Sequence, residues 1–94
     1  MSRTRPTLPL ILNYTILAAN TWELAFDLRN YDKIKTWKIK ARETTDNAFD
    51  YAYTASPTAH ISNNGAGITE NTPVKLIYVR SASVSTIMEF EGYR

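Results

Sequence analysis

Few residues in this chain can do chemistry, and they form no recognisable constellation. The sequence has one histidine, His60 in "TAHIS", and no cysteine. A nucleophile, a general base or a metal site needs several such side chains brought together, and no carboxylate pair stands in a recognisable context. We therefore expect no enzymatic activity, no catalytic residue, no cofactor and no bound metal. His60 is expected to be a hydrogen-bonding surface residue beside a strand.

The stretch "NNGAG", residues 63–67, resembles a phosphate-binding loop only in its glycines. A phosphate cradle needs a helix N-terminus after the loop and usually a lysine, but "ITENTP" follows here. The Asn64-Gly65 pair instead favours positive φ, which is typical of a hairpin turn. We expect such a turn at this point.

Basic residues gather in "RNYDKIKTWKIKAR", residues 29–42, whereas the tail "MEFEGYR" is locally acidic. A platform for single-stranded nucleic acid needs aromatic rings and cations on the same wet face. In a strand, however, Trp37 and Lys38 point to opposite faces. Solvated charge is therefore the favoured interpretation and nucleic-acid binding the weaker one. Aligned Lys38 and Lys40 would also protect an edge strand from unwanted pairing.

Size and composition restrict the class of protein. The chain has 94 residues, 44% of them hydrophobic, and a formal net charge of +2. This is enough for one domain with a single core. The absence of cysteine excludes a disulfide-stapled scaffold. No apolar run approaches the roughly 20 residues of a membrane span, and "MSRTRPTLPL" lacks the apolar region of a signal peptide, so we expect no membrane association and no export by the Sec route.

Apolar and polar residues alternate in most segments, which is the period of a β-strand. "WELAFDL", residues 22–28, has the clearest pattern, although a short helix within residues 13–28 is the main alternative. Short runs at spacings of about eight to twelve residues predict an all-β chain. The expected fold is a single antiparallel β-sandwich of about seven short strands over residues 10–94, jelly-roll or immunoglobulin-like. The expected core contains Trp22, Leu24, Phe26, Trp37, Ile39, Val74, Leu76 and Val84.

Residues 1–9, "MSRTRPTLP", contain two prolines and two arginines but no amphipathic period. Proline fixes φ and removes a backbone donor, so this segment is expected to be an extended arm rather than a helix. We expect the arm to reach onto a neighbouring chain. The residues expected to bind that partner are Arg3, Arg5, Pro6 and Pro9.

The segment "VKLIYVR" is apolar at nearly every position, although a strand with one wet face should alternate. If it forms a central strand, Val74, Leu76 and Tyr78 would face the core. Ile77 and Val79 would then face outward and need cover from the arm, another subunit or a host surface. We therefore expect Ile77 and Val79 to form a second partner-binding surface.

The second half of the chain carries a loose pattern: "YTAS", a glycine-containing loop, a "PVKL" entry, the step "YVRSAS" and a final strand ending in Glu and aromatics. Residues 48–93 thereby resemble small all-β virion proteins of tailed phages, namely head-decoration, cement or head-tail accessory subunits. The resemblance implies a non-enzymatic structural subunit, often oligomeric, located in the virion and assembled in the host cytoplasm. Its implied partners are the major capsid protein or other virion proteins, bound through loops and an extended terminus. The basic segment has no place in that pattern.

A carbohydrate-binding module of an adhesion apparatus is the alternative, because the chain has six tyrosines and aromatic rings can stack on sugars. The two hypotheses differ in where the rings lie. Coplanar, solvent-facing rings at Tyr51, Tyr53 or Trp37 around a groove would favour sugar binding, whereas inward-facing rings would favour assembly.

Overall fold

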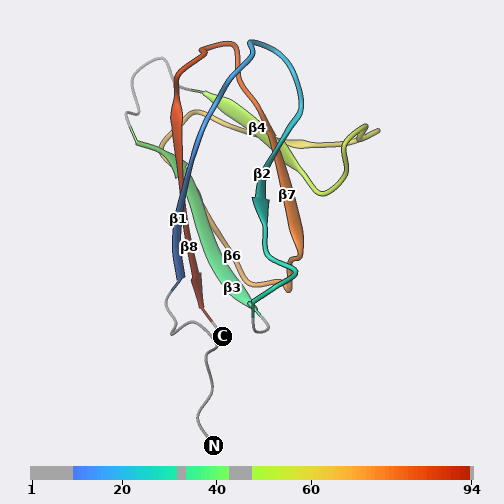
Figure 1. The fold of residues 1–94 in the computed structure, drawn as a ribbon, viewed down its shortest axis with the longest axis vertical. Coiled ribbons are helices and arrows are strands. Elements are labelled where there is room, and N and C mark those ends of the chain that lie inside the picture. The colour runs from blue at the N-terminus through green and yellow to red at the C-terminus, as the bar shows by residue number, and fades with distance from the viewer. Residues whose placement is uncertain (1–9, 32–33, 43–47, 94) are drawn as a thin grey trace, which may run out of the picture.

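The chain folds into two packed antiparallel sheets (Figure 1). The computed structural model describes residues 10–31, 34–42 and 48–93. Within these ranges the regular elements are all strands, and no helix long and apolar enough to cross a membrane is found. In chain order they are β1 (Leu10–Thr15), β2 (Glu23–Asp27), β3 (Thr36–Ala41), β4 (Phe49–Ala52), β5 (Ile61–Asn63), β6 (Ile68–Glu70), β7 (Leu76–Arg80) and β8 (Ile87–Tyr93).

Each sheet has four strands, in the order β1-β8-β3-β6 in the first and β2-β7-β4-β5 in the second. The predicted all-β antiparallel sandwich is confirmed, with eight strands rather than about seven. The short helix considered for residues 13–28 does not form. Much of that range belongs to β1 and β2 instead.

The turn at Asn64-Gly65 joins the two sheets. Gly65 has a φ of 103°, as the sequence suggested. The strands on either side, β5 and β6, belong to different sheets, so the predicted hairpin is wrong. The side-chain oxygen of Asn63 accepts hydrogen bonds from the backbone N–H groups of Gly65 and Gly67, at 2.8 and 2.9 Å. These bonds brace the crossover.

The core lies between the sheets and is rich in aromatic rings. Phe26 of β2 and Phe90 of β8 have ring centroids 5.2 Å apart, and Trp37 of β3 stacks on Phe90 at 6.1 Å. Trp37, Ile39 and Ala41 share the buried face of β3, as their alternation predicted.

The expected core was only partly right. Its members Phe26, Trp37, Ile39 and Val74 are buried, but Leu24 is 38% exposed and Val84 52% exposed. A β-bulge between Leu24 and Phe26 shifts the register of β2 against β7. An extra residue in one strand reverses the alternation, so Leu24 and Phe26 do not share a face. Val84 lies in the loop before β8. Trp22 and Leu76, also expected in the core, are only partly buried.

The predicted outward surface on β7 is wrong. Ile77 and Val79 are 0% exposed and belong to the core, where Ile77 pairs with Phe26 and Val79 with Tyr51. The strand begins only at Leu76, so the alternation cannot be counted from Val74. These two residues need no partner to cover them.

The arm of residues 1–9 lies outside the described residues. The expectation that Arg3, Arg5, Pro6 and Pro9 bind a partner therefore stays a prediction.

Candidate functional site

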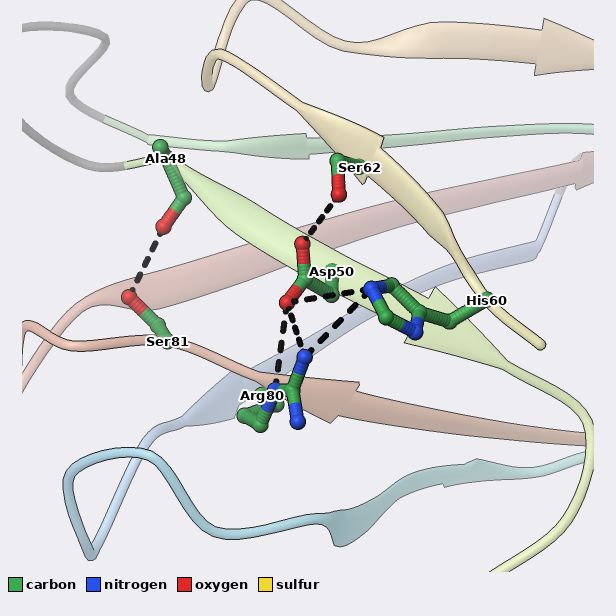
Figure 2. Close-up of polar contacts among 6 residues, drawn as sticks. All are labelled: Ala48, Asp50, His60, Ser62, Arg80 and Ser81. Carbon is green, nitrogen blue, oxygen red and sulfur yellow. Dashed lines mark hydrogen bonds and ion pairs between the residues drawn. The ribbon is translucent and has the colours of Figure 1, made fainter. Parts of the chain in front are cut away.

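A polar cluster lies on the outer face of the second sheet, centred on Asp50 (Figure 2). Asp50 of β4 is the cross-strand partner of Arg80 on β7 and of Ser62 on β5. Directly opposed residues of neighbouring strands place their side chains on the same face. Three residues that are distant in sequence thus meet because β4 lies between β7 and β5.

Asp50 accepts hydrogen bonds from both neighbours. Ser62 Oγ donates to its Oδ1 at 2.6 Å, and Arg80 Nε and Nη2 donate to its Oδ2 at 3.1 and 2.7 Å. His60 Nε2 lies 3.8 Å from Asp50 Oδ2 and 3.4 Å from Arg80 Nη2. The histidine is exposed and stands just before β5, and it has polar neighbours that the sequence could not reveal.

The charge of Asp50 is set by competing effects. Partial burial acts to raise its pKa, but hydrogen bonds from Ser62 and Arg80, with the charges of Arg80 and His60, lower the pKa below its ordinary value. A general base near neutral pH needs a raised carboxyl pKa, which this arrangement does not provide. Ser62 donates to Asp50 rather than to His60, so the Ser-His order of an acyl-transfer triad is missing. The cluster joins three strands electrostatically.

Trp22 extends this cluster towards the loop between β1 and β2. The guanidinium carbon of Arg80 lies 4.6 Å from the centroid of the Trp22 ring. His60 meets the same ring edge-on, with centroids 5.6 Å apart. A cation over an indole face is attracted by the ring quadrupole. One face of Trp22 is therefore occupied by the protein itself.

On the outer face of the first sheet the basic segment meets the acidic tail. Lys38 pairs with Glu91 and Lys40 with Glu89, as cross-strand neighbours with N–O distances of 3.9 and 3.5 Å. Arg42 Nε also lies 2.7 Å from a Glu89 oxygen. These pairs leave little unopposed charge for nucleic acid. Because β3 lies between β8 and β6, the prediction that its lysines guard a sheet edge is wrong.

The aromatic residues considered for stacking on a sugar are mostly buried. Trp37 and Tyr51 are 0% exposed, whereas Tyr53 is 44% exposed. The ring of Trp37 meets those of Tyr51 and Tyr53 at 82° and 86°. The rings are therefore perpendicular rather than coplanar.

Beside these rings is a hollow of about 380 Å³, lined by six residues. The indole N–H of Trp37 donates to the carbonyl oxygen of Thr72 at 3.0 Å, which fixes the wall of the hollow to the core. Glu70, two residues before that wall, accepts a hydrogen bond from the Tyr51 hydroxyl. We call this pocket the hollow; it is lined by Tyr53, Thr72, Pro73, Val74, Lys75 and Leu76.

At the end of the sandwich where β1 finishes and β8 starts, two loops expose apolar side chains. Leu17 is 76% exposed and Val84 is 52% exposed. Backbone hydrogen bonds join the two loops, from Ile16 N to Thr86 O and from Ser85 N to Ile16 O, both at 2.9 Å. We call Leu17 and Val84 the apolar tip.

Glu23 stabilises the loop that carries Leu17. Its carboxylate accepts hydrogen bonds from the Tyr14 hydroxyl at 2.6 Å and from the backbone N–H groups of Leu17 and Ala18, each at 3.0 Å. Burial acts to raise the pKa of Glu23, but these hydrogen bonds lower it below its ordinary value. The ionised carboxylate of Glu23 thus holds the loop that carries Leu17.

Comparisons with protein-family models, with curated proteins and with solved structures found no match for this chain. Function must therefore be argued from the residues. Neither the Asp50 cluster nor the apolar tip was predicted from the sequence. The cluster depends on pairings between residues up to 30 positions apart, for which no local signal exists, and the tip was not predicted because Val84 was expected in the core.

Proposed function

We propose that this chain is a non-enzymatic structural subunit of a virion, of the head-decoration, cement or head-tail accessory kind, which binds the major capsid protein or other virion proteins as a repeated subunit. The observation that carries the binding role is the apolar tip. Leu17, at 76% exposure, leaves most of its surface in water. Contiguous exposed apolar surface is typical of protein contact sites, and backbone hydrogen bonds hold together the two loops that carry Leu17 and Val84.

The tip is suited to bind another protein because it is preorganised. Glu23 holds the backbone of Leu17 and Ala18, so little loop entropy is lost on binding. The described residues of the two loops, 16–22 and 81–86, include no charged side chain. The centres of protein interfaces are likewise depleted of charge.

Carbohydrate binding has less support. The rings that would stack on a sugar are buried at Trp37 and Tyr51, and the exposed Tyr53 stands at 78° to Tyr51. Trp22 is stacked by Arg80. Because two of the three rings at Trp37, Tyr51 and Tyr53 are buried and none of the three is coplanar with another, assembly is better supported than carbohydrate binding.

The virion assignment itself depends on the resemblance of residues 48–93 to small phage virion proteins. It is tested by mass spectrometry and immunogold labelling of tailed particles released by a host that carries the gene. We expect the chain in purified particles, with Leu17→Ser and Val84→Ser together reducing its incorporation. Thr69→Ala, which alters an exposed residue of β6 away from the tip, is the matched control. Absence of the unaltered chain from particles would refute the proposal.

A further inference from the structure

We propose that the hollow between Tyr53 and Leu76 receives the N-terminal arm, residues 1–9, of a neighbouring copy of this chain. This inference rests on the proposed function, in which the arm binds a neighbour, and it names the surface that the arm binds. It is carried by the chemistry of the arm, by that of the hollow, and by the position of Leu10 in the first sheet.

The arm has a three-residue repeat. Arg3, Pro6 and Pro9 occur at every third position in "RTRPTLP". A polyproline II helix has three residues per turn, so in that conformation the three side chains lie along one edge. Pro-x-x-Pro segments bind in this way to aromatic-lined grooves.

The hollow offers the groups that such a segment needs. Tyr53 presents a ring that is 44% exposed, and the partly buried Leu76 provides apolar surface beside it. Proline rings pack on an aromatic face at low entropic cost, because the bound conformation is already favoured in the free chain. The pocket therefore fits the proline edge of the arm.

Glu70 supplies the opposite charge for Arg3. Its carboxylate accepts a hydrogen bond from the Tyr51 hydroxyl, and the Tyr51 ring centroid lies 6.3 Å from that of Tyr53, which lines the hollow. It forms no ion pair with any cation of the described residues. Lys75 also lines the hollow, so the arginine end of the arm is directed to the Glu70 side.

The geometry of the first sheet limits how far Pro9 can lie from Leu10, so an arm that places both Pro6 and Pro9 in one hollow comes from another copy. The pairings place Leu10, Gly92, Trp37 and Glu70 in one row across β1, β8, β3 and β6. Leu10 is therefore three strand spacings from Glu70, about 14 Å at roughly 4.8 Å each. Pro9 is bonded to Leu10, and adjacent Cα atoms are only about 3.8 Å apart. Pro9 thus cannot reach the hollow of its own chain.

An arm bound in the hollow of the next copy joins two unlike surfaces, so it generates a dimer by reciprocal exchange of arms, a larger ring or an open filament. The test uses two variants of the full chain. The arm variant carries Arg3→Ala, Pro6→Ala and Pro9→Ala and keeps its hollow. The hollow variant carries Tyr53→Ser and Leu76→Ser and keeps its arm. Circular dichroism first shows that each variant folds; if the double hollow variant does not, Tyr53→Ser alone replaces it.

Sedimentation velocity should show concentration-dependent oligomers for the unaltered chain and monomers for each variant alone. A mixture of the two variants should form a one-to-one complex, since one partner has an intact arm and the other an intact hollow. Ile61→Ser, which removes an exposed apolar residue of β5 outside both the hollow and the apolar tip, should leave the oligomers unchanged. Glu70→Gln should weaken association about tenfold, and added salt should remove that difference. A monomeric unaltered chain, or a mixture that does not pair, would overturn the inference.

Failure of this inference and failure of the proposed function give different results. If both variants enter particles as well as the unaltered chain does while the mixture fails to pair, the inference is wrong and the virion role is retained. If the chain is absent from particles but the variants still complement each other, the arm contact holds and the virion role is wrong.

Discussion

Truncation of Phe26 compared with truncation of Leu24 tests the bulge in β2. The two residues are two positions apart, and strict alternation would place both in the core. The structure instead leaves Phe26 2% exposed and Leu24 38% exposed, with the bulge between them. Phe26→Ala and Leu24→Ala should therefore have very different effects on the free energy of unfolding.

The magnitudes follow from burial. Phe26→Ala removes a ring that packs on Phe90 at 5.2 Å and leaves a closed cavity, at a cost of about 3 to 5 kcal/mol. Leu24→Ala removes surface that is already partly in water and leaves a space that water fills, so it should cost only about 1 kcal/mol. A domain of this size has roughly 5 to 14 kcal/mol of stability in total, so Phe26→Ala removes a large fraction of it.

Urea unfolding monitored by circular dichroism measures both changes, with the denaturant slope checked for constancy. In thermal unfolding followed by the same signal, Phe26→Ala should lower the melting temperature by about 12 °C or more, and Leu24→Ala should lower it by only a few degrees. The unaltered chain and both variants should share one native spectrum at low temperature. Equal losses of stability in the two variants would show that the bulge is absent and that the simple alternation was correct.

Three further changes test other parts of the structure. Asp50→Asn should make the protein less sensitive to acid: the lowered pKa of Asp50 means that its contribution is present at neutral pH and lost as pH falls through that value. Urea unfolding measured across the acid range tests this expectation. If the free energy of unfolding falls in parallel for the unaltered chain and for Asp50→Asn, the expectation is wrong. Gly67→Ala should lower the melting temperature by several degrees, because Gly67 has a φ of +103° and an added Cβ would lie 2.6 Å from Lys40 Cβ; an unchanged melting curve would contradict the tight crossover. Tyr14 has its pKa raised to about 12 by burial and by Glu23, so its neutral form stabilises the fold at pH values below the unfolded pKa, and that contribution is lost as pH rises towards 12. Glu23→Gln should move the tyrosinate absorbance transition of Tyr14 to lower pH, and no movement would count against the hydrogen bond.

Part of the fold follows from local pattern alone. In "TWKIKA" each second residue is apolar, and a β-strand puts such residues on one face, so the burial of Trp37, Ile39 and Ala41 could be predicted without knowledge of their partners. The absence of cysteine likewise excluded a disulfide framework. Alternation is a local property of the backbone, and it needs no tertiary information.

Tertiary structure decided which way β2 and β7 face and which side chains meet. The bulge at Leu24 and the start of β7 at Leu76 depend on hydrogen-bond register with other strands, and a shift of one residue exchanges the two faces. The partners of His60 and Lys38 were equally hidden, because Arg80 and Glu91 come from strands distant in the chain. Periodicity determines which residues of one strand share a face, but only packing against the second sheet determines which face is buried.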